Sequence, residues 1–211
     1  MTTKKKDIRS KKDHPHRKRN IVFNPKSSAL LVIDMQEYFC NPLSHAYFKQ
    51  ASSLVPNIQK LITAYRRKSL PVIFTRYALL RTEPKGSMGR WWNDVLYDDE
   101  AMAPLIESLH LLPKEPIIRK TQYSAFFQTN LESILKNNHV TSLVITGVLT
   151  HLCCETTARD AFMRGYDVFF ITDATASDLK RFHTASLAAL SDGFATLTTT
   201  RELCAWVNKN R

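Results

Sequence analysis

Short apolar runs alternate with helix-like segments along most of the chain. The runs are continuous, as in strands that are buried on both faces of a parallel sheet. We predict strands at residues 29–34, 71–75, 117–120, 142–146, 168–173 and 195–198. Between most of these runs, apolar residues recur at intervals of three and four, the spacing of an amphipathic helix. We predict helices at residues 53–68, 105–112, 130–137, 153–165, 183–191 and 202–208.

This alternation predicts an α/β fold with a single domain. A chain of 211 residues is long enough for one substantial core, and it contains no internal repeat. We expect a three-layer α/β/α arrangement, with helices on both faces of a mostly parallel six-stranded sheet. Residues 79–99 are predicted to be irregular, because Pro84, Gly86 and Gly89 interrupt any helical pattern there.

Three chemically capable residues each follow a different predicted strand: Asp34, Lys120 and Cys153. Taken singly, they are consistent with a turn aspartate, a solvated lysine and an inert buried cysteine. The carboxyl ends of parallel strands meet at one edge of a sheet, so we expect the three to lie together. Cys153 begins a predicted helix, whose free amides lower the pKa of a thiol. A carboxylate beside it can act as the base, and an ammonium can stabilise the anion.

Three motifs surround these residues, in the order Val32-Ile-Asp34-Met-Gln36, Lys120-Thr-Gln-Tyr123-Ser124-Ala-Phe126 and Gly147-Val-Leu-Thr-His-Leu-Cys153. Together they resemble the isochorismatase-like cysteine hydrolase superfamily, whose fold is Rossmann-like. Its members include nicotinamidases, N-carbamoylsarcosine amidases and isochorismatases. The resemblance runs from about residue 28 to about residue 207, and its strength lies in the combination of motifs.

The resemblance implies a role for each of these positions. Cys153 matches the family nucleophile, Asp34 its general base and Lys120 its third catalytic member. A non-proline cis peptide bond is implied between Val148 and Leu149. The backbone amides of Leu149 and Cys153 are then implied to form the oxyanion hole. Such preorganised donors stabilise the charge that develops at the transition state.

The reaction implied by this set is cleavage of an amide or ureido C–N bond in a small molecule, through a Cys153 thioester. One alternative remains open, because the sequence around Tyr123 and His151 is also very similar to that of true isochorismatases. Those enzymes convert isochorismate to 2,3-dihydro-2,3-dihydroxybenzoate and pyruvate, with the aspartate at position 34 as a general acid. They generally carry glycine at position 153, so the cysteine favours thiol chemistry.

Seven residues are candidates for substrate binding: Gln36, Phe39, Arg76, Trp91, Trp92, Tyr123 and His151. Arg76 either grips a substrate carboxylate or is a surface arginine. His151 either contacts substrate or is a hydrogen-bonded turn residue. The adjacent tryptophans 91 and 92 are interpreted as an aromatic lid, with a subunit interface as the alternative.

We expect neither a metal nor any other cofactor. Nicotinamidases carry an Asp-x-His element and a further histidine after the second strand, and these residues bind a metal that holds the pyridine nitrogen. Here the corresponding stretch is Phe74-Thr75-Arg76-Tyr77-Ala78, and the next histidine is His110. This departure disfavours nicotinamide as the substrate.

The net charge of +11 is concentrated at the N-terminus, where residues 1–20 contain nine basic and two acidic side chains. We predict a disordered tail over residues 1–22 and a hydrolase domain over residues 23–211. The tail either binds nucleic acid or another anionic surface, or is a solvated extension, and the second interpretation is favoured.

The sequence contains no apolar run that could span a bilayer, no secretory signal and no C-x-x-C pair. We therefore predict a cytoplasmic enzyme with reduced thiols and without a membrane partner, and the resemblance implies a homodimer or homotetramer. Two other functional classes are weighed against an enzyme: an inactive scaffold that binds nucleic acid through its tail, and a redox-sensing thiol protein.

Overall fold

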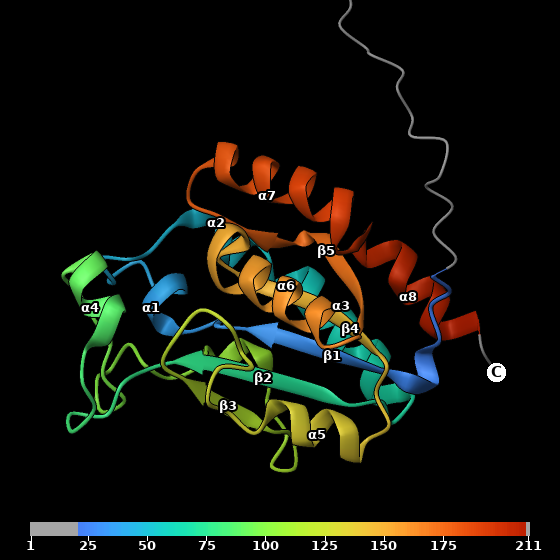
Figure 1. The fold of residues 1–211 in the computed structure, drawn as a ribbon, viewed down its shortest axis with the longest axis horizontal. Helices are drawn as coiled ribbons and strands as arrows, with labels where there is room; N and C mark the ends of the chain where they lie inside the picture. Colours follow the sequence, from blue (N-terminus) through green and yellow to red (C-terminus); the bar gives the residue numbers. More distant parts are fainter. Residues whose placement is uncertain (1–20, 210–211) are drawn as a thin grey trace, which may run out of the picture.

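The computed structural model describes residues 21–209, so most of the predicted basic tail lies outside the described residues. Six strands form one sheet in the order β3-β2-β1-β4-β5-β6, and each neighbouring pair is parallel (Figure 1). The strands are β1 (Ser28–Ile33), β2 (Val72–Tyr77), β3 (Ile117–Lys120), β4 (Ser142–Val148), β5 (Asp167–Ala176) and β6 (Thr196–Thr198). The predicted α/β fold is confirmed, and the sheet is entirely parallel.

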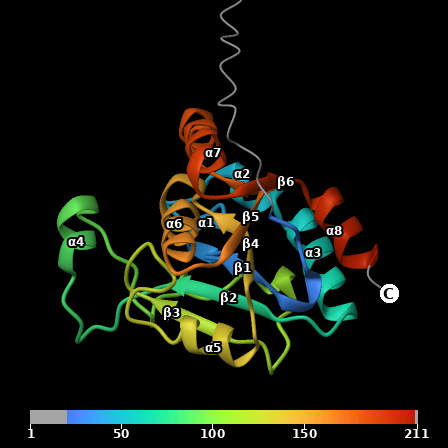
Figure 2. The ribbon, with the colours of Figure 1, turned by 45° about the vertical axis from the view of Figure 1, so that its right-hand side comes forward.

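Helices cover both faces of the sheet. The α-helices are α1 (Glu37–Cys40), α2 (Lys49–Ser53), α3 (Val55–Arg67), α4 (Gly86–Trp92), α5 (Leu131–Asn137), α6 (Glu155–Met163), α7 (Lys180–Gly193) and α8 (Thr200–Lys209). Three other helical turns are η1 (Pro25–Ser27), η2 (Glu107–Leu109) and the π-helical η3 (Thr150–Cys154). Helices α3 and α8 pack on one face, whereas α5, α6 and α7 pack on the other (Figures 1 and 2).

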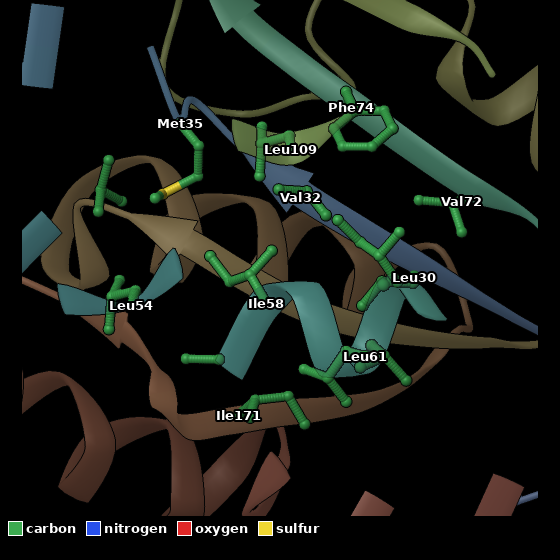
Figure 3. Packing of buried hydrophobic residues seen from close by; sticks show 14 of the residues in the cluster. Leu30, Val32, Met35, Leu54, Ile58, Leu61, Val72, Phe74, Leu109 and Ile171 are labelled. Carbon is green, nitrogen blue, oxygen red and sulfur yellow. The ribbon is translucent and has the colours of Figure 1, made fainter. Parts of the chain in front are cut away.

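The central strand β1 shows why the sheet is buried on both sides. All six of its residues are fully buried. Alternate side chains point to opposite faces, so Leu30 and Val32 enter the core beneath α3 while Leu31 and Ile33 enter the core beneath α5 and α6. Figure 3 shows the first core, in which apolar side chains of α3 meet those of β1, β2 and β5.

The segment predicted to be irregular, residues 79–99, contains helix α4, so the prediction was wrong for Gly86–Trp92, whereas residues 79–85 and 93–99 lie in no helix or strand. The helix begins at Gly86, which adopts a positive φ of 57°, and it ends before Asn93 in the left-handed region. The glycines and proline that suggested a loop instead lie before and within a short helix. Figures 1 and 2 both show α4 standing out from the body at the end of the molecule where β1 and β2 finish.

Other elements differ in extent from the prediction. The short helices α1 and α2 were not predicted, and the helix expected at residues 105–112 is the single turn η2. Strands β4 and β5 continue beyond their predicted ends, to Val148 and Ala176. Within residues 21–209, none of the helices has the length and apolar character needed to cross a bilayer.

Candidate active site

The structure brings together Asp34, Lys120 and Cys153, the three residues predicted to meet at the carboxyl ends of the strands. Asp34 directly follows β1, Lys120 is the last residue of β3, and Cys153 lies in η3 after β4. Their exposed fractions are 0%, 1% and 6%, respectively. The Lys120 Nζ atom lies 2.7 Å from Asp34 Oδ2 and 3.2 Å from Cys153 Sγ. An acid, a base and a thiol therefore meet in a site that is largely shielded from solvent.

Strand β2 fixes the position of the carboxylate. Asp34 adopts a left-handed φ of 50°, and its backbone N–H donates to the carbonyl of Thr75 at 3.1 Å. The hydroxyl of Thr75 donates to Asp34 Oδ1 at 2.7 Å. This leaves Oδ2 facing the Lys120 ammonium. Sequence reasoning missed Thr75, although its place near the end of a buried strand is the same signal that identified Asp34.

The ammonium of Lys120 is held by three neighbours. Besides Asp34 and Cys153, it donates to the carbonyl of Gln122 at 3.0 Å. Burial lowers the pKa of Lys120, but the negative charges and hydrogen bonds of Asp34 and Cys153 raise it, and the net result lies above the usual value. The side chain is therefore a fixed positive charge at neutral pH.

Burial raises the pKa of the Cys153 thiol to about 12, even though the ammonium of Lys120 lowers it. The carboxylate of Asp34 raises it further through its charge and a hydrogen bond. The net direction is opposite to the lowered pKa that was predicted, since Cys153 sits in the π-helical turn ahead of α6 and desolvation dominates. The resting thiol is protonated, so it needs a base before it can attack.

The peptide bond between Val148 and Leu149 is cis. It lies between the end of β4 and η3, where the sequence resemblance placed it. The carbonyl of Leu149 accepts hydrogen bonds from the amides of Leu152 and Cys154, at 3.1 and 3.2 Å. These bonds close the turn that carries the thiol.

Two predicted substrate residues are engaged by the protein itself. The side chain of Gln36 is fully buried, and its Oε1 accepts from the Tyr77 amide at 2.8 Å. Its Nε2 donates to the carbonyls of Tyr77 and Ala103, at 3.0 and 2.7 Å. Arg76 forms an ion pair with Asp98. The side-chain amide of Gln36 therefore hydrogen-bonds to the protein backbone, and the guanidinium of Arg76 is already paired with a carboxylate.

The other predicted substrate residues come from four different segments. Trp92 Nε1 donates to the hydroxyl of Tyr123 at 2.7 Å, which ties the end of α4 to the segment after β3. The neighbouring Trp91 is 80% exposed. Phe39 is half-buried and packs against the first core. His151 is half-buried, and its Nδ1 lies 2.8 Å from the hydroxyl of Ser177.

The family model of the Isochorismatase domain matches residues 28–202. The chain belongs to the isochorismatase family. It is 39% identical over 177 residues to Nicotinamidase 3 of Arabidopsis thaliana, covering 82% of the chain and 85% of that relative. It is 30% identical to Isochorismatase of Bacillus subtilis (strain 168), covering 78% of the chain and 53% of that relative.

A solved structure agrees with this assignment. The crystal structure of a cysteine hydrolase from Pseudomonas syringae pv. phaseolicola 1448A superposes with a TM-score of 0.84 at 30% identity. The match covers 89% of the chain and 95% of that structure. The protein is therefore an isochorismatase-family hydrolase, and the site at the ends of β1, β3 and β4 is its candidate active site.

The surroundings of this isochorismatase-family site show what it offers to a ligand. A cavity of about 240 Å³ lies beside Lys120, between residues 79–86 and 119–128. Among residues 21–209, no group of three or more histidine, cysteine, aspartate or glutamate side chains is arranged to hold a metal ion. Sequence reasoning also missed Tyr77, whose ring centre lies 5.8 Å from Lys120 Nζ.

Proposed function

We propose that this protein cleaves an amide or ureido C–N bond of a small molecule through a thioester on Cys153. The observation that carries the proposal is the contact of one buried ammonium with both a carboxylate and a thiol. Lys120 Nζ lies 2.7 Å from Asp34 and 3.2 Å from Cys153. A buried charge is costly unless it is paired. This arrangement is therefore typical of a catalytic site that stabilises charge as it develops during the reaction.

The first half of the reaction begins with proton transfer. Oδ1 of Asp34 is occupied by Thr75, so Oδ2 takes the proton of the Cys153 thiol. The sulfur then attacks the substrate carbonyl, while Lys120 stabilises the new negative charge. The backbone amides of Leu149 and Cys153 receive the oxyanion. When the C–N bond breaks, the nitrogen leaves as ammonia or an amine with the proton returned by Asp34.

The second half of the reaction releases the acid. Asp34, again a carboxylate, removes a proton from water, and the resulting hydroxide attacks the thioester carbonyl. The C–S bond breaks, and the proton on Asp34 restores the Cys153 thiol. The same carboxylate therefore serves as base and acid in both halves, which agrees with its buried, hydrogen-bonded position.

For the substrate, we propose a small carboxamide first and a ureido compound second. The similarity to Nicotinamidase 3 makes nicotinamide the first carboxamide to test, although the sequence around Arg76 and Tyr77 disfavoured it. The second candidate function is hydrolysis of isochorismate, with Asp34 as the general acid. It is favoured by the 30% identity to Isochorismatase of Bacillus subtilis.

A panel of nicotinamide, aliphatic amides, ureido compounds and isochorismate tests both functions, with ammonia and pyruvate measured in every reaction. We expect ammonia from at least one amide or ureido compound, and a loss of about a thousandfold or more in Cys153→Ala. Mass spectrometry of the quenched reaction should show an acyl adduct on Cys153. Pyruvate release that survives in Cys153→Ala, without ammonia from any compound, would favour the isochorismatase function instead.

We also propose that the enzyme acts as a homodimer or homotetramer in the cytoplasm. The described cysteines are all free, as a reducing compartment requires. The exposed Trp91 on the projecting helix α4 offers an aromatic contact for another subunit. Light scattering on a size-exclusion column tests this, and Trp91→Ala should weaken the assembly if α4 lies in its interface.

A further inference from the structure

The hydroxyl of Tyr77 is a buried polar group that has no hydrogen-bond partner among the described residues. The residue as a whole is only 7% exposed. Buried hydroxyls are almost always satisfied, and Tyr65 shows the usual arrangement, with its hydroxyl 3.0 Å from that of Ser28. An unsatisfied phenol in a folded enzyme therefore calls for a functional explanation.

Tyr77 stands at the edge of the sheet that carries the candidate active site. It is the last residue of β2, and in the parallel register it is paired with Lys120. The charge of Lys120 and the nearby groups of Cys153 and Tyr123 all act on its phenol. Its ring centre lies 5.8 Å from Lys120 Nζ, which itself lies 3.2 Å from Cys153 Sγ, so Tyr77 borders the candidate active site.

Hydrogen bonds to the backbone and apolar packing of the ring hold Tyr77 in place. Gln36 binds both the N–H and the carbonyl of Tyr77, so the backbone is clamped from both sides. The ring packs in a small cluster with Met88 of α4 and with Leu96, and Tyr123 lies against the same cluster. A phenol held in this way is preorganised to meet a ligand without further ordering.

We propose that Tyr77 is a substrate-binding residue whose hydroxyl donates a hydrogen bond to a second acceptor atom of the substrate, away from the carbonyl that Cys153 attacks. The inference rests on the proposed amide hydrolysis and narrows its substrate class. That class is a small, planar carboxamide with another acceptor on its ring, since Met88, Leu96 and Tyr123 give the ring of Tyr77 apolar and aromatic neighbours beside the charge of Lys120.

The chemistry of the phenol fits a donor role. Burial raises the pKa of Tyr77 to about 12; Lys120 lowers it and Asp94 raises it. The hydroxyl therefore keeps its proton at neutral pH and can donate. A ring nitrogen or a carbonyl oxygen of the substrate accepts that bond, whereas a C–H at the same place leaves the hydroxyl unsatisfied.

Binding to the full-length Cys153→Ala protein, measured by titration calorimetry, tests this independently of turnover. The probes are benzamide and the three pyridinecarboxamides, which differ from it only by a ring nitrogen. We expect at least one pyridinecarboxamide to bind about tenfold more tightly than benzamide. Adding Tyr77→Phe should abolish that preference. Equal binding of all four compounds, no binding by any of them, or a preference that survives Tyr77→Phe would overturn the inference.

Tyr65→Phe is the matched control, because it also removes one buried phenol hydroxyl but from a site with a partner. We expect Tyr65→Phe to lower the melting temperature and to leave the ligand preference intact. Tyr77→Phe should leave the melting temperature unchanged or raise it, since no hydrogen bond is lost. If the preference depends on Tyr77 but the intact enzyme releases no ammonia from these amides, the proposed reaction fails while the binding role stands.

Discussion

At the scale of single residues, the state of Cys153 is decided by a competition. The ammonium of Lys120 favours the thiolate, but burial and the carboxylate of Asp34 favour the thiol, and together they raise its pKa to about 12. Asp34 therefore has opposite effects before and during catalysis. Its charge opposes formation of the thiolate in the free enzyme, yet it is the group that accepts the proton when substrate is present.

Because of these opposite effects, Asp34→Asn should change the alkylation rate of Cys153 and the rate of hydrolysis in opposite directions. Removing the negative charge should lower the pKa of Cys153, because Asp34 raises it and Lys120 is then free to pair with the sulfur. Alkylation of Cys153 by iodoacetamide at about pH 8 should become several-fold faster. Hydrolysis of the amide substrate should fall by about a hundredfold or more, since the base is lost. Peptide mapping by mass spectrometry separates Cys153 from the other thiols.

Asp173→Asn provides the control for that experiment. Asp173 lies on β5, and its carboxylate accepts from the amide and hydroxyl of Thr200, outside the active site. It should change neither the alkylation of Cys153 nor turnover. Slower alkylation in Asp34→Asn would show that Asp34 promotes the thiolate even without substrate, and the protonated resting state would then be wrong.

At the scale of elements, the approach of β1 to β4 sets the distance between Asp34 and Cys153. Gly147 pairs with Ile33 in the register and has a φ of 106°. A Cβ at this position would overlap the backbone of Ile33 and lie 2.7 Å from its nitrogen. Gly147→Ala should therefore lower the free energy of unfolding by about 3 kcal/mol or more, measured by urea denaturation.

Gly193→Ala is the matched substitution for Gly147→Ala. Gly193 ends α7, and an added Cβ would meet nothing within 4 Å. Its free energy of unfolding should be unchanged or slightly higher, because alanine loses less backbone entropy than glycine on folding. If the two variants proved equally stable, close packing of β1 against β4 would not explain the glycine at position 147.

The strands were easier to predict from the sequence than the short helices were. Strand β1 was predicted to within one residue, because its continuous burial leaves a plain apolar run. Strand β3 was predicted with its observed ends, although only alternate residues of it are buried. Helix α4 was missed, since Gly86 and Gly89 argue against a helix locally. The helix is instead stabilised by contacts with residues that are distant in the sequence, such as the hydrogen bond from Trp92 to Tyr123. Local propensity cannot report such contacts.

The same limit applies to the candidate site. Asp34, Lys120 and Cys153 could be predicted to meet, because parallel strands bring their carboxyl ends to one edge. The partner of a polar side chain could not be predicted. Gln36 binds the backbone of Tyr77, 41 residues away, and a sequence motif does not distinguish this from a substrate contact.

At the scale of the whole molecule, the described cysteines predict a loss of stability in alkali. Three of them, Cys40, Cys153 and Cys154, are buried and free. Burial raises the pKa of Cys40 and of Cys153 to about 12, and it raises that of Cys154 well above its usual value. An exposed thiol in the unfolded chain ionises near pH 8.5. The unfolded chain therefore releases these protons at a lower pH than the folded protein does.

Because the folded pKa values are raised, their contribution to stability is complete below about pH 8.5 and is lost as the pH rises towards about 12. Each buried thiol should cost about 1.4 kcal/mol of unfolding free energy per pH unit in that range. Urea denaturation from about pH 7 to about pH 10.5 should show a steepening loss. Cys40→Ala should reduce the slope of unfolding free energy against pH by the contribution of one buried thiol. Cys204→Ala should reduce that slope by less, because Cys204 is half-exposed. A profile that stays level above about pH 9, or that Cys40→Ala leaves unchanged, would mean that these thiols ionise equally in both states.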